Sequence, residues 1–397
     1  MAEIHDLFRK QFGYLPVHIV RAPAIIELIG AGSGLNHGLA IAAALDRHVE
    51  IACAPRSDAK CCVADGTTGP TGTFRPDTFV RNVAAPWADF PKAILQQFQK
   101  RGLRSGGFDA LILDQVPVGT GLNRFAALQV ATVLALRSLF PFRLARSGPG
   151  LPPERDSHGK LPPLTADEGW ELASLCRAAL REFLGIECRS IEHEAALFAK
   201  PWHLLSIDAP LSACETLPLF GCVCVLSRET SLQARPAVTE MNEMAIDFDA
   251  GARKLGLKSL RTADLGLMKA NRERLSSHEC ECACYAVAET ARAVAAEHAL
   301  RNNDIAQFAA YMEQSADQYQ SLFGPAPPSP LLQIGRSHHA CFGGRLVPGC
   351  VGGAAVHLVA HHQADDFTCS LAGQYQQQTG QQIRSWVCTL GDSDGFG

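Results

Sequence analysis

A strand, a glycine loop and a long apolar helix follow one another between Phe108 and Phe140, and this order constrains the fold more than any other feature. The strand leads into Gly119 and Gly121, and from about Arg124 the chain runs as an unbroken, mostly apolar helix. A glycine loop that opens into a helix N-terminus points several backbone N–H groups at one place, which is the geometry that binds phosphate. The segment therefore predicts a mixed fold of strands and helices with a phosphate-binding turn.

The rest of the chain also mixes strands with helices. Its first quarter carries β-branched apolar runs and one helical periodicity, at Trp87–Lys100. Thr165, with Glu168 three residues later, has the pattern of a helix N-cap, and that helix is expected to end near Leu184. The later half is mostly helical, with expected helices at Thr239–Leu255, Leu265–Arg274, Cys284–His298 and Asp304–Leu322. No internal repeat is found, so the pattern predicts an α+β fold or a mixed sandwich, with two lobes.

One stretch interrupts these elements. From Pro141 to Pro163 the chain is rich in proline, glycine and charged residues, which is typical of a flexible connection. We expect this stretch to be a flexible insertion in an N-terminal lobe that covers residues 1–210. The C-terminal lobe is then expected over residues 211–397.

The charge balance argues against a polyanionic partner. Lysine and arginine number 36 against 40 aspartates and glutamates, so no basic surplus is available for nucleic acid. The polar segment Met1–Tyr14 is unlike a secretory signal, and no apolar run is long enough to span a bilayer. We expect a cytoplasmic monomer that binds small molecules and neither nucleic acid nor membrane.

The fifteen cysteines are scattered along the chain, whereas a disulfide framework would be denser and the chain shorter. Cys280, Cys282 and Cys284 lie close together, but a zinc site would need a second ligand pair at metal spacing, which we do not find. In a helix, Cys280 and Cys284 share a face and Cys282 does not. We expect reduced, structural cysteines and no metal site.

Three blocks, in order, resemble the galactokinase branch of the GHMP small-molecule kinases. Arg21–Val49 resembles the family's opening motif Arg-Ala-Pro-Gly-Arg-Val-Asn-Leu-Ile-Gly-Glu-His-Thr-Asp. Val116–Leu136 resembles its phosphate loop, Pro-x-Gly-x-Gly-Leu-Ser-Ser-Ser-Ala-Ala-Leu, and Gly343–Val359 is similar to its glycine-rich C-terminal motif. The linking segments agree as well, so the resemblance covers nearly the whole chain.

The resemblance implies the two-lobed GHMP kinase fold. Its N-terminal lobe is ribosomal protein S5 domain 2-like, and its C-terminal lobe contains a ferredoxin-like unit. The resemblance also implies ATP and Mg²⁺ at the phosphate loop with a sugar beside them. In the family the 1-hydroxyl of galactose is phosphorylated, an aspartate acts as base or charge partner, and an arginine stabilises the transferring phosphoryl group.

The phosphate loop departs from the family at its three serines. The loop residues to which the resemblance assigns the cofactor are Gly119, Gly121, Leu122, Asn123, Arg124, Phe125 and Ala126. Asn123, Arg124 and Phe125 stand where the family has serine. Small hydroxyl residues let backbone N–H groups close on phosphate and can ligate Mg²⁺, which phenylalanine cannot do. Arg124 is either a phosphate contact or a surface arginine on the first helical turn.

The catalytic positions depart too. Glu192 lies at the aspartate position, where it is either a base one methylene longer or a solvated or paired helix carboxylate. Ile25 lies at the arginine position, and the chemistry of the arginine is lost there. At the sugar-contacting positions Asn36 is retained, Gly34 replaces an acidic residue, and Asn242 is kept beside a lost tyrosine. We therefore expect Gly34, Asn36 and Asn242 to contact the substrate.

These departures leave three hypotheses. Loss of a transition-state arginine costs on the order of 10³–10⁵ in rate, and displacement of a general base costs roughly 10²–10⁴. The first hypothesis is an impaired ATP-dependent sugar kinase, and the second is an inactive pseudokinase that binds or regulates through a ligand. The third is a decayed chain that folds without a function.

Overall fold

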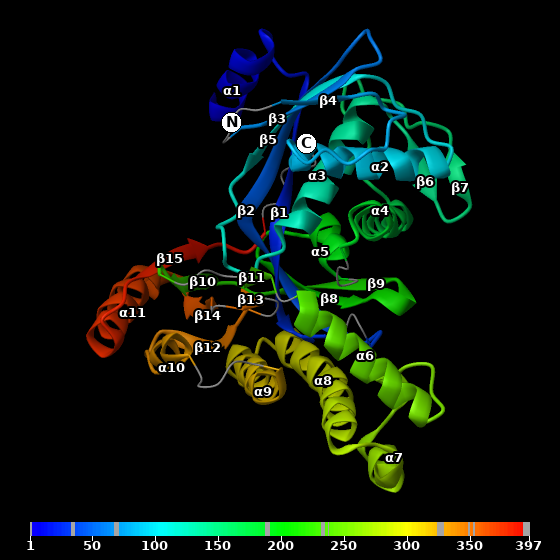
Figure 1. Ribbon diagram of the computed structural model, residues 1–397. Helices are drawn as coiled ribbons and strands as arrows, with labels where there is room; N and C mark the ends of the chain where they lie inside the picture. Colours follow the sequence, from blue (N-terminus) through cyan, green and yellow to red (C-terminus); the bar gives the residue numbers. More distant parts are fainter. Residues whose placement is uncertain are drawn as a thin grey trace.

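The structure is a computed structural model, and helices pack against both of its larger β-sheets (Figure 1). It describes residues 2–32, 36–66, 71–186, 191–231, 235–236, 238–323, 329–347, 350–351 and 354–391. The predicted mixture of strands and helices is confirmed. No helix in this part of the chain is long and apolar enough to cross a membrane.

The first sheet has seven strands and is organised around one long strand. Its strands are β1 (His18–Ile29), β2 (Ala40–Pro55), β3 (Cys61–Asp65), β4 (Thr71–Phe74), β5 (Phe108–Asp114), β8 (His203–Asp208) and β9 (Ala213–Pro218). One edge of β2 pairs with β1 along most of its length, while the other edge pairs with β8 at one end and β5 at the other. Because β1 and β5 both pair with β2, the loop after β1 and the glycine loop after β5 follow strands of the same sheet.

Helices cover both faces of this sheet. They are α1 (Ala2–Phe12) on one face, and α2 (Asp89–Lys100), α3 (Arg124–Leu139), α4 (Ala166–Ala179) and α5 (Glu192–Phe198) on the other (Figure 1). Helix α3 packs directly on β1 and β2 and is buried along almost its whole length. Its apolar sequence is explained by this central position, since a helix surrounded by protein needs no polar face.

The second sheet has four strands in the order β12, β14, β10, β15. These are β10 (Cys222–Glu229), β12 (Cys341–Leu346), β14 (Ala355–Ala360) and β15 (Ile383–Cys388), and a small sheet joins β11 (Arg235–Pro236) to β13 (Cys350–Val351). The helices of this half are α6 (Val238–Lys254), α7 (Leu265–Ala270), α8 (Ser277–Arg301), α9 (Ile305–Phe323), α10 (Pro330–Arg336) and α11 (Ala364–Thr379). A bridge between Leu45 and Leu390 links the two sheets.

Several sequence predictions are confirmed, and others are refined. Thr165 caps α4 in a capping box with Glu168, as expected, and a single π-helical turn (Leu180–Leu184) ends that helix. Helix α8 begins earlier than predicted because Ser276 and Glu279 form a second capping box. Helix α1 was not predicted at all, since its short apolar face is buried only through contact with the sheet.

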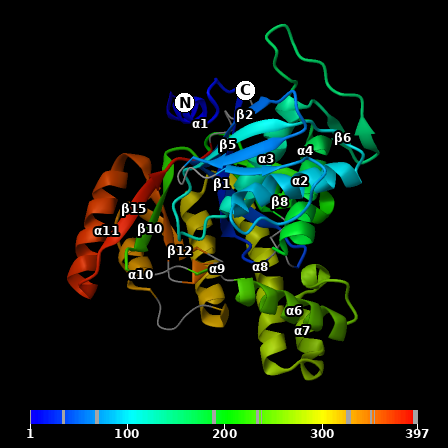
Figure 2. The ribbon, with the colours of Figure 1, turned by 45° about the horizontal axis from the view of Figure 1, so that its top comes forward.

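The lobe boundary and the insertion stay predictions. Strand β9 still pairs with β8 in the first sheet, so the chain passes to the second sheet at residues 219–221, a little after the expected boundary. The stretch expected to be a flexible insertion contains a small hairpin of β6 (Arg143–Ala145) and β7 (Gly148–Gly150). Figure 2 shows the chain between β7 and α4 as a long loop that projects from the first lobe.

Candidate functional site

The phosphate loop, residues 119–126, runs from the turn after β5 into the first turn of α3, as the sequence predicts. Gly119 and Gly121 have φ values of 75° and 77°, in the left-handed region that favours glycine. The hydroxyl of Thr120 donates to the carbonyl of Pro117 at 2.7 Å, which closes the turn. The backbone therefore has the predicted glycine-rich turn at the N-terminus of a buried helix.

Asn123 occupies the place in this turn where a bound anion would be expected. Its side-chain oxygen accepts hydrogen bonds from the backbone N–H groups of Phe125 and Ala126, both at 3.1 Å. Its side-chain NH₂ donates to the carboxylate of Glu192. Two N–H groups at the start of α3, which have no partner within the helix, are thus already satisfied by the protein itself.

The two neighbouring substitutions are also engaged within the protein. Arg124 forms an ion pair with Asp114 at the end of β5. Burial raises the pKa of the Asp114 carboxyl, and the Arg124 charge opposes that rise. Phe125 stacks on Phe90 of α2, with ring centroids 5.5 Å apart and an interplanar angle of 12°. Arg124 is thus paired with a carboxylate of its own chain, and a contact between Arg124 and phosphate stays a prediction.

Helix α5 brings three titratable side chains into the interior of the first lobe. Glu192, His193 and Glu194 are all buried, and Glu194 forms an ion pair with Arg177 of α4. Burial lowers the pKa of His193 to about 3, with a smaller contribution from the Arg177 charge. Burial raises the pKa of Glu194, against the effect of Arg177. Glu192 is therefore a paired carboxylate at the loop, and the same first turn of α5 is held by the ion pair between Glu194 and Arg177.

The expected arginine position carries no charge. Ile25 lies in β1 opposite Ala44 and belongs to the hydrophobic core. Arg345 of β12 is fully buried nearby in the fold and donates to the carbonyl of Leu28 at 2.6 Å. The sequence analysis did not single out Arg345, because nothing in its motif indicated a hydrogen bond from its side chain to the backbone of β1.

The loop after β1, at the expected sugar positions, packs against helices of the second half. Tyr285 donates from its hydroxyl to the carbonyl of Ala31 at 2.8 Å, and burial raises the pKa of Tyr285 well above its usual value. A Cβ on Gly32 would overlap with Met244 and lie 3.3 Å from the Phe248 ring. Gly32 is thus a close-packed position between β1 and α6.

Of the three residues expected to contact substrate, one is described in full. The side-chain oxygen of Asn36 accepts a hydrogen bond from the backbone N–H of Leu260 at 2.8 Å, and the residue is buried. Gly34 lies outside the described residues, and Asn242 lies on α6 with its side chain outside them. A substrate role for these three residues stays a prediction.

Mg²⁺ does not fit the phosphate loop as it is arranged. The oxygen of Asn123 faces two backbone N–H groups, its NH₂ faces Glu192, and Asp114 is paired with Arg124. Within the described residues, two clusters of His, Cys, Asp and Glu have ligand atoms close enough to share an ion, and neither includes a loop residue: Asp247, His278 and Cys282, and His338, His339 and Asp366. No reaction step is therefore assigned to a loop-bound metal.

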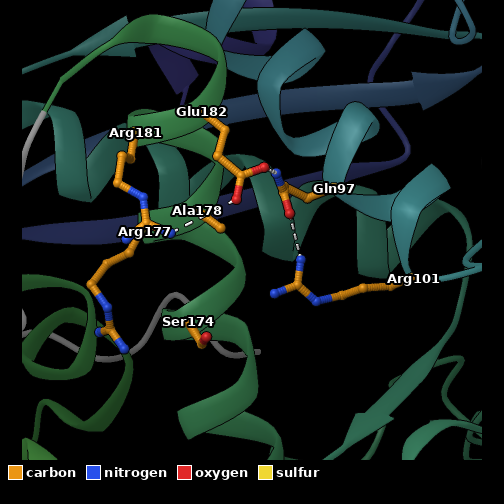
Figure 3. Close-up of a pocket in the computed structure, with 7 residues that line it drawn as sticks. All are labelled: Gln97, Arg101, Ser174, Arg177, Ala178, Arg181 and Glu182. Carbon is orange, nitrogen blue, oxygen red and sulfur yellow. Dashed lines mark hydrogen bonds and ion pairs between the residues drawn. The ribbon is translucent and has the colours of Figure 1, made fainter.

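A polar cavity of about 290 Å³ lies between α2 and the end of α4 (Figure 3). It is lined by Gln97, Arg101, Ser174, Arg177, Ala178, Arg181 and Glu182. Arg101 extends from the α2 side, and Arg181 and Arg177 lie on the α4 side (Figure 3). No residue of the phosphate loop lines this cavity, so its chemistry is separate from that of the loop, although Arg177 connects it to α5 through Glu194.

Comparisons with known proteins agree with the motifs. A family model described as "Galactokinase galactose-binding signature" matches residues 6–55. The chain is 27% identical to the galactokinase of Roseiflexus sp. (strain RS-1), with 100% of this chain and 96% of that protein covered. It is 26% identical to the galactokinase of Chloroflexus aggregans, over 98% of this chain and 96% of that protein.

Solved structures show the same fold. The galactokinase of Lactococcus lactis, solved with galactose, superposes with a TM-score of 0.83 at 18% identity, covering 98% of each chain. The mevalonate kinase of Methanococcus jannaschii superposes with a TM-score of 0.60 at 14% identity, covering 94% of this chain and 98% of that one. The GHMP kinase fold and the resemblance to its galactokinase branch are therefore confirmed.

Proposed function

We propose that this chain of the galactokinase branch is a galactokinase-like sugar kinase in which ATP-dependent phosphoryl transfer is strongly impaired. The observation that carries the proposal is the position of Asn123. Its side chain binds the N–H groups of Phe125 and Ala126 and the carboxylate of Glu192 at the same time. A nucleotide phosphate would need these two N–H groups. To act as a catalytic base, Glu192 would need to be free of the Asn123 side chain.

The remaining parts of the site support slow chemistry at best. Glu192 supplies a carboxylate at the position of the family's aspartate, and Gly119 and Gly121 supply the turn on which phosphate would rest. Ile25 contributes no positive charge, because it is apolar and buried in β1. Loss of a transition-state arginine alone lowers the rate by about 10³–10⁵. We expect turnover at least 10³-fold below the range of about 1–100 s⁻¹ that is usual for kinases.

The acceptor is proposed to be a monosaccharide bound beside the loop that follows β1. Asn36, Gly34 and Asn242 are the proposed contacts, and the 1-hydroxyl of galactose is the group phosphorylated by relatives of this type. The family's charged sugar-contacting residues are replaced at Ala31 and Gly32 and at the positions that follow. A pocket that has lost buried hydrogen-bonding groups discriminates poorly between sugars, so we expect weak selectivity for galactose.

A second candidate function is that of a ligand-binding or regulatory protein without catalysis. The engagement of Asn123, Arg124 and Phe125 within the chain favours it, because each substituted residue has an intramolecular partner instead of a phosphate. Under this proposal the loop that follows β1 binds a sugar ligand, while the phosphate loop serves only to hold α3 and α5 together. A cytoplasmic monomer remains the proposed form for both functions.

Calorimetric titration of the folded chain with Mg-ATP, with and without galactose, separates these proposals, and a turnover assay over a panel of sugars follows. The impaired kinase should bind nucleotide weakly and turn over slowly. Sugar binding without nucleotide binding or turnover would support the second candidate. Turnover in the normal kinase range would overturn the impaired-kinase proposal. The absence of heat with either ligand at millimolar concentration, from a chain that melts cooperatively, would overturn both.

A further inference from the structure

Helices α6 and α8 pack side by side, and three side chains with metal-binding atoms converge between them. Asp247 comes from α6, while His278 and Cys282 come from the first turns of α8. His278 and Cys282 are four residues apart and therefore lie on one face of the helix, one turn after another. The cluster is far along the chain from the phosphate loop and shares no residue with it.

The distances between the three donor atoms match one face of a metal tetrahedron. Nε2 of His278 lies 3.0 Å from Oδ2 of Asp247 and 3.6 Å from Sγ of Cys282, and that sulfur lies 3.9 Å from the same carboxylate oxygen. Bonds of about 2.3 Å to sulfur and about 2.0 Å to nitrogen and oxygen would place these donor atoms about 3.3 to 3.6 Å apart at a tetrahedral ion. Shifts of a few tenths of an ångström would therefore complete the geometry.

The surroundings of the cluster suit a cation that enters from solvent. Cys282 is fully buried, Asp247 is partly buried, and the His278 side chain is 60% exposed. One side of the cluster is thus closed by protein and the other is open to water. Glu281 adds another negative charge close to the Cys282 thiol. The open side supplies an entry path and a fourth position, which a water molecule can take.

We propose that Asp247, His278 and Cys282 form a binding site for a divalent transition-metal ion, best matched by Zn²⁺. A thiolate, an imidazole and a carboxylate are the donor types that Zn²⁺ accepts, whereas Mg²⁺ and Ca²⁺ prefer oxygen ligands. The sequence analysis expected no metal site because it found no second ligand pair at metal spacing beside Cys280, Cys282 and Cys284.

The site is placed to stabilise the support of the loop after β1. On α6, Met244 lies three residues before Asp247 and Phe248 follows it directly, and both would meet a side chain at Gly32. Phe248 also lies against Tyr285 of α8, with ring centroids 6.5 Å apart. An ion that joins α6 to α8 would fix the surface on which the loop rests, whether or not the protein transfers phosphate.

The test uses the full chain, stripped of metal with a chelator and titrated with Zn²⁺ and with Co²⁺. We expect Zn²⁺ to raise the melting temperature and one equivalent of Co²⁺ to give an ultraviolet thiolate-to-cobalt charge-transfer band. Cys282→Ser should abolish the band, and Cys284→Ser, two residues along the same helix, should keep it. Asp247→Asn and His278→Ala should each weaken Zn²⁺ binding at least about 100-fold, since loss of even an outer hydrogen-bond partner of a ligand costs 10–100-fold.

Two results would overturn the proposal. One is the absence of the cobalt band in the unmodified chain, and the other is a band that persists in Cys282→Ser. Should Cys282→Ser fail to fold, the Asp247→Asn and His278→Ala variants decide the question, because both side chains reach solvent. Zn²⁺ affinity that is unchanged in both of these variants would place any bound metal elsewhere and so reject this site.

Discussion

The side-chain NH₂ of Asn123 donates to the carboxylate of Glu192 and so joins the start of α3 to the start of α5. The same side chain caps α3 through its oxygen. One residue therefore stabilises the helix N-terminus and engages the carboxylate that the resemblance places at the catalytic position. The N–H groups of the loop that would bind phosphate are already hydrogen-bonded to Asn123. Binding of phosphate there therefore requires the Asn123 side chain to move or to be replaced.

Asn123→Ser is expected to raise the affinity for Mg-ATP about tenfold or more. Serine still caps a helix but does not reach Glu192, so one N–H group of α3 and the carboxylate become available to a ligand. Each hydrogen bond released is worth about 1 kcal/mol, and tenfold corresponds to about 1.4 kcal/mol. The measurement is calorimetric titration of the variant beside the unmodified chain.

Asn123→Asp is the matched control for that variant. Aspartate also caps α3, but it places a negative charge against Glu192 and near any phosphate, so nucleotide affinity should fall. An Asn123→Ser variant that binds nucleotide no better than Asn123→Asp would show that the asparagine does not block the loop.

Glu192→Ala tests whether the displaced carboxylate still contributes to catalysis. Any turnover detected in the unmodified chain should fall by about 10²–10⁴ when the carboxylate is removed. The assay follows phosphorylated product over hours with a panel of sugars, and a cooperative melt confirms that the variant is folded. Unchanged turnover would assign the residual activity to other groups and leave Glu192 as a structural partner of Asn123.

The sequence predicted the parts of this site that depend on neighbouring residues. Gly119 and Gly121 signalled the turn, and the Thr165–Glu168 pair signalled the start of α4, because both depend on backbone geometry within a few residues. The contact between Asn123 and Glu192 joins positions 69 residues apart and depends on how α5 packs against α3. Patterns of residue spacing within a helix or turn do not predict contacts between residues so far apart in the sequence.

The same limit explains the features that the sequence analysis missed. The hydrogen bond from Arg345 to Leu28 joins the second sheet to β1 and depends on how β12 and β1 both pack against α9. Asp247 joins His278 and Cys282 only because α6 packs on α8. Helix α1 is different, because Ile4, Leu7, Phe8 and Phe12 have the spacing of an amphipathic helix, and only the sheet face that they cover depends on long-range packing. Long-range packing decides the contacts of Arg345 and Asp247, whereas local patterns decide turns, caps and amphipathic helices.

Gly32→Ala is expected to destabilise the protein by about 2–3 kcal/mol. Its φ of 80° is unfavourable for alanine, and the new Cβ would also overlap with Met244. Gly185→Ala is the control, because its φ is 68° and no atom lies within 4 Å of the added Cβ, so only about 1 kcal/mol of backbone strain is expected. Urea unfolding of both variants gives the difference. Equal losses would show that Met244 moves aside at little cost.

Arg177→Met is expected to cost about 3 kcal/mol or more, because it leaves the buried Glu194 without its ion-pair partner. Adding Glu194→Gln to that variant should recover part of the loss. Lys100→Met breaks the exposed ion pair with Glu182 near the same cavity and should cost less than about 1 kcal/mol. Chemical unfolding of these three variants beside the unmodified chain gives the losses, and a small loss for Arg177→Met would mean that water reaches Glu194.

The stability of the protein should fall as the pH drops from about 6.5 towards 4, partly because of His357. This histidine is fully buried beneath α10 and against Phe367, and burial lowers its pKa from 6.5 to about 4. Between these values the unfolded chain binds a proton at His357 that the folded chain does not bind. Lower pH therefore favours the unfolded state, by at most about 1.4 kcal/mol per pH unit for this one group.

The variant His357→Gln removes that proton and should flatten the dependence. Glutamine has the polarity to fill the site without titrating, so the variant is expected to be less stable at pH 7.5 and to lose less stability on acidification. Urea unfolding at pH 7.5, 6, 5 and 4.5 gives the two slopes. His193, whose pKa burial lowers to about 3, keeps part of the slope in the variant. Parallel curves for the two proteins would mean that His357 is protonated in the folded state over this range and does not drive the acid sensitivity.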